Sequence, residues 1–113
     1  MKREDYQTLS AMELGALIAA RQIQVREVVA QCLEQIGQDR RLNAWITVDA
    51  SQALVQADQV QARIDRGETM SLLAGVPIAI KDNISTRNLR TTCASRMLAD
   101  YVPPFDATVI ERI

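Results

Sequence analysis

The stretch LLAGVPIAIKDNIST, residues 72–86, decides how this sequence is interpreted. It contains a predicted strand over residues 74–80 that is apolar on both faces, which is typical of a strand in a sheet covered on both sides. Pro77 cannot donate a ladder hydrogen bond and usually stands at an edge or a bulge, so it complicates this assignment. The predicted strand is followed directly by Lys81, and a lysine at that point needs an explanation.

Two interpretations of Lys81 are open from the local pattern. At the C-terminal end of a buried strand, Lys81 stands where open α/β sheets place ligands. Loss of hydration there disfavours the ammonium form and suits a general base. Alternatively, Lys81 has already left the core and extends its charged end to solvent. Asp82 points to the opposite face, and we expect Asp82 and Asn83 to fix the turn after the strand through hydrogen bonds to the backbone.

Residues 1–70 are predicted to form an N-terminal helical region. The expected helices cover residues 11–21, 25–36 and 50–67. Ser10 and Glu13 form a capping box at the start of the first helix. The second helix carries apolar residues at a 3.6-residue spacing, and Gly37 is its expected stop. A short strand is expected over residues 43–49.

Three residues in or next to the first two predicted helices need separate comment. Gly15 weakens the first helix by about 1 kcal/mol relative to alanine, unless a neighbouring segment packs closely against it. Cys32 falls on the apolar stripe of the second helix, so we interpret it as a small core residue rather than a reactive thiol. Gln24 stands where serine or threonine is expected as the N-cap of that helix.

Residues 71–113 have a different pattern. After the predicted strand, residues 85–105 show no clear periodicity, which is long for a connection without structure of its own and often marks a functional loop. Asp106 is the expected N-cap of a helix that begins at Thr108. Because the sequence stops at Ile113, partway through that helix, we expect the chain to be the N-terminal part of a longer protein.

The composition excludes several classes of site. The formal net charge is −1 and both signs are spread along the chain, so the basic stripe of a protein that grips phosphate backbones by itself is missing. The chain has no histidine, which excludes an in-chain Ser–His or Cys–His mechanism and any histidine metal site. Cys32 and Cys93 match no metal-ligand spacing, and no metal site is predicted.

No segment approaches the ~20 apolar residues that a membrane-spanning helix needs. The first ten residues, MKREDYQTLS, mix acids with bases and lead into no apolar signal-peptide core. We therefore expect a cytoplasmic protein that does not associate with a membrane.

Three segments carry a resemblance to a known family. GVPIAIKDN, TTCASRML and PPFDATVIERI, which begin at residues 75, 91 and 103, closely resemble the amidase signature family. The resemblance covers essentially the whole chain and is most specific over residues 72–113. It implies an α/β fold, a large mixed β-sheet covered by helices. Residues 1–70 would then be the N-terminal helices, and residues 71–113 the start of the amidase core with its first strands, which is incomplete here.

The resemblance also implies a mechanism. Members of the family use a Ser–cis-Ser–Lys triad, in which the lysine acts as general base through a bridging serine onto a nucleophilic serine. Lys81 matches the lysine by motif, but the serines have no counterpart here. Ser85 and Ser95 are not equivalents, since they follow Lys81 without the glycine-rich surroundings of an oxyanion hole. We therefore expect this chain alone to be inactive.

Other polar residues of the same loop have weaker assignments. Thr91, Thr92 and Ser95 are candidates for the rim of the substrate pocket, and the alternative is that they are loop residues facing solvent. Cys93 lacks a histidine partner and is interpreted as packing within the loop rather than as a nucleophile.

Within the family, TTCAS and FDATV most resemble the glutamine-hydrolysing subunits of glutamyl-tRNA(Gln) amidotransferases. That resemblance implies glutamine as substrate, other amidotransferase subunits as partners, and Glu-tRNA(Gln) reached indirectly through the complex. A partner subunit would use ATP and Mg, and this chain itself would hold no cofactor. Two alternatives stay open: another hydrolase of small amides, or a truncated non-catalytic module that binds partner subunits.

Overall fold

The computed structural model describes residues 5–113 and divides them into two units. The first unit comprises residues 5–43 and 50–77, and the second comprises residues 44–49 and 78–113. The change of unit at residue 77 lies a little beyond the expected boundary at residue 70, and the short segment 44–49 belongs with the later part of the chain. Each unit is described separately below.

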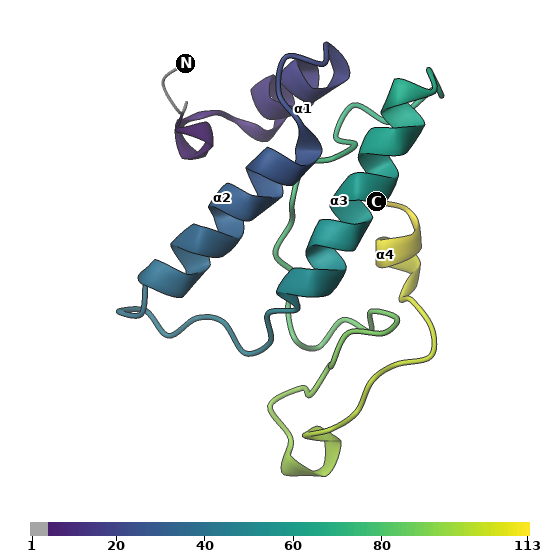
Figure 1. Ribbon diagram of the computed structural model, residues 1–113. Helices are drawn as coiled ribbons and strands as arrows, with labels where there is room; N and C mark the ends of the chain where they lie inside the picture. Colours follow the sequence, from purple (N-terminus) through teal and green to yellow (C-terminus); the bar gives the residue numbers. More distant parts are fainter. Residues whose placement is uncertain (1–4) are drawn as a thin grey trace. The chain divides into compact units, whose positions relative to one another are not determined.

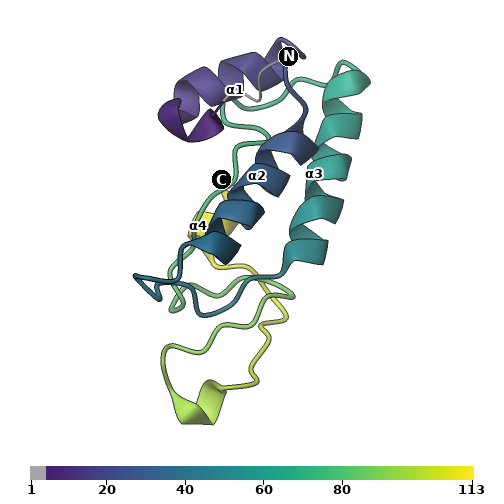
Figure 2. The same ribbon diagram turned by 60° about the vertical axis from the view of Figure 1, so that its left-hand side comes forward.

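The first unit is helical. Its elements are the 3₁₀ turn η1 (Tyr6–Thr8) and the helices α1 (Ala11–Ala19), α2 (Val25–Gln38) and α3 (Ala50–Asp65). Helices α2 and α3 lie side by side, as Figures 1 and 2 show from two directions. Apolar residues from all three helices and the α1–α2 turn form one core: Leu14, Ile18, Ile23, Val25, Val28, Val29, Ala57 and Ile64.

The predicted capping box of α1 is confirmed. The Ser10 side chain accepts a hydrogen bond from the Glu13 backbone N–H, and the Glu13 carboxylate accepts from the Ser10 N–H at 2.8 Å. The bonds that the Glu13 carboxylate accepts from the Ser10 N–H and the Ser10 hydroxyl lower its pKa. Helix α1 ends at Ala19, earlier than expected, because Arg21 adopts a left-handed φ of 58°. The Arg21 guanidinium then donates to the Ile64 carbonyl at 2.8 Å, which satisfies a backbone oxygen near the end of α3.

Helix α2 begins at Val25, as expected, but its N-terminal cap and its end differ from expectation. Gln24 provides no side-chain cap; instead the Gln61 side chain of α3 accepts a hydrogen bond from the Val25 N–H at 3.0 Å. The prediction that Gly37 stops α2 is wrong, because the helix continues to Gln38. Gly67, in contrast, adopts a φ of 77° just after α3, as expected for a C-terminal glycine.

Cys32 is half-buried on α2, in keeping with its position on the apolar stripe, and this burial raises the pKa of its thiol.

The two predicted strands do not form: within residues 5–113 the backbone shows no β-strand, and Thr86 and Leu89 make an isolated antiparallel bridge. A strand is stabilised by the ladder of a neighbouring strand, and the described residues supply none for residues 43–49 or 74–80. The Val76 N–H is used in a turn, donating to the Leu73 carbonyl. The sheet of the expected α/β fold is therefore absent from the part of the chain that the structure describes.

Residues 85–105 lack regular structure, as predicted, yet hydrogen bonds order them. The backbone N–H of Asn88 donates to the Pro103 carbonyl at 3.2 Å, and the N–H of Thr91 donates to the Tyr101 carbonyl at 3.0 Å. Pro103 is fully buried. The later stretch from Tyr101 therefore runs beside the earlier one, and a 3₁₀ turn, η2 (Arg96–Leu98), lies between them.

The second unit ends with helix α4 (Thr108–Glu111). The prediction that Asp106 caps this helix is wrong, because Ala107 is the N-cap and no side chain bonds there. The Asp106 carboxylate instead accepts a hydrogen bond from the Arg87 N–H at 2.6 Å. Among residues 5–113, no helix combines the length and the apolar character needed to cross a membrane.

Two helical glycines should respond oppositely to alanine. A Cβ at Gly15 would lie 2.2 Å from the carbonyl oxygen of Leu72, whereas a Cβ at Gly37 would meet nothing within 4 Å. Alanine favours a helix by about 1 kcal/mol over glycine, but overpacking typically costs about 1–3 kcal/mol. We expect Gly15→Ala to lower the free energy of unfolding and Gly37→Ala to raise it, both measured by urea denaturation. Stabilisation by both changes would contradict the close approach of Leu72 to α1.

Candidate functional site

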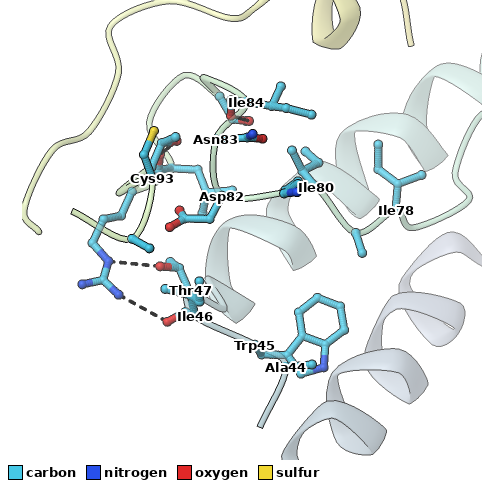
Figure 3. Close-up of a pocket in the computed structure, with 17 residues that line it drawn as sticks. Ala44, Trp45, Ile46, Thr47, Ile78, Ile80, Asp82, Asn83, Ile84 and Cys93 are labelled. Carbon is cyan, nitrogen blue, oxygen red and sulfur yellow. Dashed lines mark hydrogen bonds between the residues drawn. The ribbon is translucent and has the colours of Figure 1, made fainter. Parts of the chain in front are cut away.

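The second unit contains a pocket of about 650 Å³. Two stretches of chain, residues 44–47 and 78–84, form much of its lining (Figure 3). Six further residues complete it: Thr86, Leu89, Arg90, Thr91, Cys93 and Ala94. Aliphatic side chains and one indole dominate the lining, with a few polar groups among them, as is usual for a small-molecule site.

Lys81 lines this pocket at the end of the apolar stretch that includes Ile78 and Ile80. It is the sole lysine of the described residues, and it is exposed. The Lys81 carbonyl accepts a hydrogen bond from the Ile84 N–H at 3.0 Å, which closes a turn over Asp82 and Asn83. The chain therefore places an exposed lysine among the lining residues of a largely apolar pocket.

Asp82 ties that turn to the loop ten residues later. One carboxylate oxygen accepts from the Thr92 N–H at 2.9 Å, and the other accepts from the Thr92 hydroxyl. The Asp82 carbonyl also accepts from the Cys93 N–H at 2.8 Å. We call these three bonds the Asp82 anchor. The bonds from the Thr92 side chain and backbone lower the pKa of Asp82, with a smaller effect of the Arg90 charge, so the carboxylate is ionised near neutral pH.

The Asp82 anchor holds a strained turn. Cys93 and Ala94, at the centre of the turn from Thr92 to Ser95, have left-handed φ values of 51° and 56°. Such a conformation costs roughly 1–2 kcal/mol for a residue with a side chain. All four backbone N–H groups of the turn are engaged, since the Ala94 N–H donates to the Thr92 hydroxyl and the Ser95 N–H to the Thr92 carbonyl. The turn therefore offers no spare backbone N–H donor for an oxyanion.

The structure brings together some of the predicted site residues and not others. Lys81, Asp82, Asn83 and Thr91 all line the pocket. Thr91 is buried, and its hydroxyl donates to the Leu89 carbonyl at 3.1 Å.

Two of the predicted rim residues, Thr92 and Ser95, are not among the residues that line the pocket. Thr92 is buried with its hydroxyl bonded to Asp82. The Ser95 hydroxyl accepts from the Met97 N–H at 3.3 Å and so caps η2. Cys93 is exposed and lines the pocket, whereas Ser85 is half-buried and is not among the lining residues. Within residues 5–113, no cluster of three or more potential metal ligands is found.

Sequence reasoning missed Arg90 and the segment 44–47. The Arg90 guanidinium donates to the Thr47 hydroxyl at 3.0 Å and to the Ile46 carbonyl at 3.2 Å, bonds drawn in Figure 3. These partners precede Arg90 by more than forty residues. A bond between a side chain and a distant segment has no local sequence signature, and Arg90 is half-buried only once the chain has folded.

Comparison with known proteins gives a consistent family. The sequence profile of a family described as Amidase matches residues 27–113. A relative from Moorella thermoacetica, named as a subunit of glutamyl-tRNA(Gln) amidotransferase, is 49% identical over 106 residues, which is 93% of this chain and 22% of the relative. The corresponding mitochondrial protein of Homo sapiens is 42% identical, over 92% of this chain and 20% of the relative. The mitochondrial protein of Ornithorhynchus anatinus is 40% identical, over 93% of this chain and 20% of the relative. The chain thus spans about a fifth of the length of the curated relatives it matches.

The Asp82 anchor should weaken in acid. Its bonds hold the pKa of Asp82 below the ordinary value, which is about 3.9 in unstructured peptides. The stabilisation it contributes is therefore fully present above about pH 3.9 and is lost as the pH falls through the lower pKa of the folded state. We expect the NMR amide signals of Thr92 and Cys93 to titrate with a midpoint below about 3.9.

Two variants complete this test. Asp82→Ala should abolish the titration of the Thr92 amide and speed its hydrogen exchange at every pH, because the acceptor is gone. Asp100→Asn, at an exposed aspartate of the same unit, should change neither quantity. A Thr92 midpoint at or above the ordinary aspartate value, or slow exchange in Asp82→Ala, would contradict the anchor.

Proposed function

Because this chain belongs to the amidase family, we propose that it carries the general base of the glutamine-hydrolysing subunit of a glutamyl-tRNA(Gln) amidotransferase. The observation that carries the proposal is the position of Lys81. This residue lines the pocket and directly precedes Asp82, whose carboxylate binds the Thr92 N–H. The bacterial and mitochondrial relatives, which are named as subunits of this enzyme, support the assignment within the family.

The proposed chemistry is acyl transfer through a Ser–cis-Ser–Lys triad. Lys81, in its neutral form, accepts a proton through a bridging serine from the nucleophilic serine, which attacks the side-chain amide of glutamine. The carbon–nitrogen bond breaks, ammonia leaves with the added proton, and a serine ester remains. Water then releases glutamate. We assign both serines, and the oxyanion donors that the turn at Thr92 does not offer, to the parts of the relatives' length that this chain does not span.

The wider context belongs to the same proposal. In the whole protein, residues 74–80 would pair with further strands of a mixed sheet, which would also cover both faces of this apolar stretch. The ammonia would convert Glu-tRNA(Gln) to Gln-tRNA(Gln) in a cytoplasmic complex, where a partner subunit binds the tRNA and uses ATP with Mg²⁺. The net charge of −1 fits a protein that leaves nucleic-acid binding to its partner.

A second candidate is an amidase-family hydrolase of small apolar amides. The aliphatic and indole lining of the pocket favours it, because glutamine is polar at both ends. The two candidates share Lys81 and differ in the amide that is cleaved fastest.

The test uses a chimera in which residues 1–113 replace the matching part of the Moorella thermoacetica relative. We expect it to release ammonia from glutamine, and Lys81→Ala to lower kcat by roughly 10²–10⁴-fold, the usual contribution of a general base. Lys81→Arg should be as inactive, because a guanidinium keeps the charge but cannot accept a proton.

Arg87→Ala is the matched control, since Arg87 is an exposed cation outside the pocket lining, and it should keep full activity. Undiminished hydrolysis by Lys81→Ala would refute the assigned role. Faster cleavage of apolar amides than of glutamine, with the same dependence on Lys81, would select the second candidate.

A further inference from the structure

One guanidinium joins three parts of the second unit. Arg90 Nε donates to the Thr47 hydroxyl at 3.0 Å, and its two Nη groups donate to the carbonyls of Ile46 at 3.2 Å and Ala99 at 3.1 Å. Arginine suits this task because its planar group presents five donors in fixed directions. A lysine ammonium at the same position is a compact point donor on a flexible stem and cannot reproduce the fork.

The segment that Arg90 holds forms part of the pocket. Residues 44–47 have no helix or strand of their own, and Trp45 and Ile46 remain 45% and 55% exposed. Their apolar side chains nevertheless line the same pocket as Lys81 (Figure 3). Bonds from Arg90 to Ile46 and Thr47 therefore fix where this apolar lining stands.

We propose that Arg90 is a positioning residue that holds Trp45 and Ile46 as the apolar wall of the Lys81 pocket, against which the methylene stem of the amide substrate packs. The catalytic part of this inference rests on the proposed function. The placement of the wall does not, because it follows from the hydrogen bonds and the lining residues alone.

The position of Arg90 in the chain links the wall to the Lys81 turn. Arg90 stands two residues before Thr92, which is bonded to Asp82, and Asp82 directly follows Lys81. The same loop thus holds the turn that carries the amine and the wall that faces the substrate. The Arg90 side chain takes no part in the three bonds of the Asp82 anchor. We therefore expect a substitution of Arg90 to move the wall and to leave these bonds in place.

Trp45 supplies a direct readout, because it is the chain's sole tryptophan. In the 113-residue chain, we expect Arg90→Lys and Arg90→Gln to shift the indole fluorescence to the red and to increase its quenching by acrylamide. The single indole N–H signal in the NMR spectrum should move as well. Arg87→Lys, at an exposed arginine three residues earlier, should leave all three readouts unchanged.

Thr47→Val keeps the proposal testable if an Arg90 variant does not fold. It removes one acceptor of the guanidinium and leaves the other two, so the Trp45 signals should move in the same direction by a smaller amount. The helical circular dichroism should persist, because α1, α2 and α3 belong to the first unit. Trp45 signals that stay unchanged in Arg90→Lys and Thr47→Val would overturn the proposal.

Kinetics of the chimera test the second part of the proposal, that the wall binds the substrate. Arg90→Lys should raise KM for glutamine several-fold with a smaller change in kcat, since the wall contacts the substrate stem rather than the reacting atoms. A loss in kcat with KM unchanged would overturn the role of the wall in binding substrate. If the unsubstituted chimera cleaves no amide, the proposed function fails, and the Trp45 signals still decide whether Arg90 holds the wall.

Discussion

The bonds between Asp82 and Thr92 are the constraint on which the second unit depends. Within the described residues this unit has no sheet and only short helical turns, so side chains must hold its loops together. The ionised Asp82 carboxylate accepts hydrogen bonds from the Thr92 N–H and the Thr92 hydroxyl. The next two residues after Thr92, Cys93 and Ala94, have left-handed φ values. A left-handed conformation costs roughly 1–2 kcal/mol for each of those residues, and the anchor bonds hold them in it close to the turn that follows Lys81.

Local patterns predicted the helices well because their causes are local. The capping box at Ser10 and the apolar stripe of α2 are visible in consecutive residues. The ends of the helices depended on distant groups instead: Gln61 caps α2, and Arg21 binds the end of α3. The expected strands had the right apolar residues, but the ladder partner that a strand requires is not among residues 5–113.

For the candidate site, too, the sequence predicted what depends on neighbouring residues and not what depends on distant ones. Lys81 and its neighbours Asp82 and Asn83 came from one short motif, and all three line the pocket. The sequence did not indicate that Thr92 would bind Asp82 rather than line the pocket. Nor did it indicate that Arg90 would bring in residues 44–47, because both contacts depend on how separate segments fold onto one another.

The central claim is that the bonds between Asp82 and Thr92 together hold Lys81 in the position that the proposed reaction requires. A double-mutant cycle tests it most directly, with kcat/KM for glutamine measured in the chimera for Asp82→Asn, Thr92→Val and the pair. Both changes disrupt the bond between the Thr92 hydroxyl and the Asp82 carboxylate. The double variant should therefore lose no more activity than the more impaired of the two single variants. Losses that multiply, or a double variant with full activity, would contradict the account.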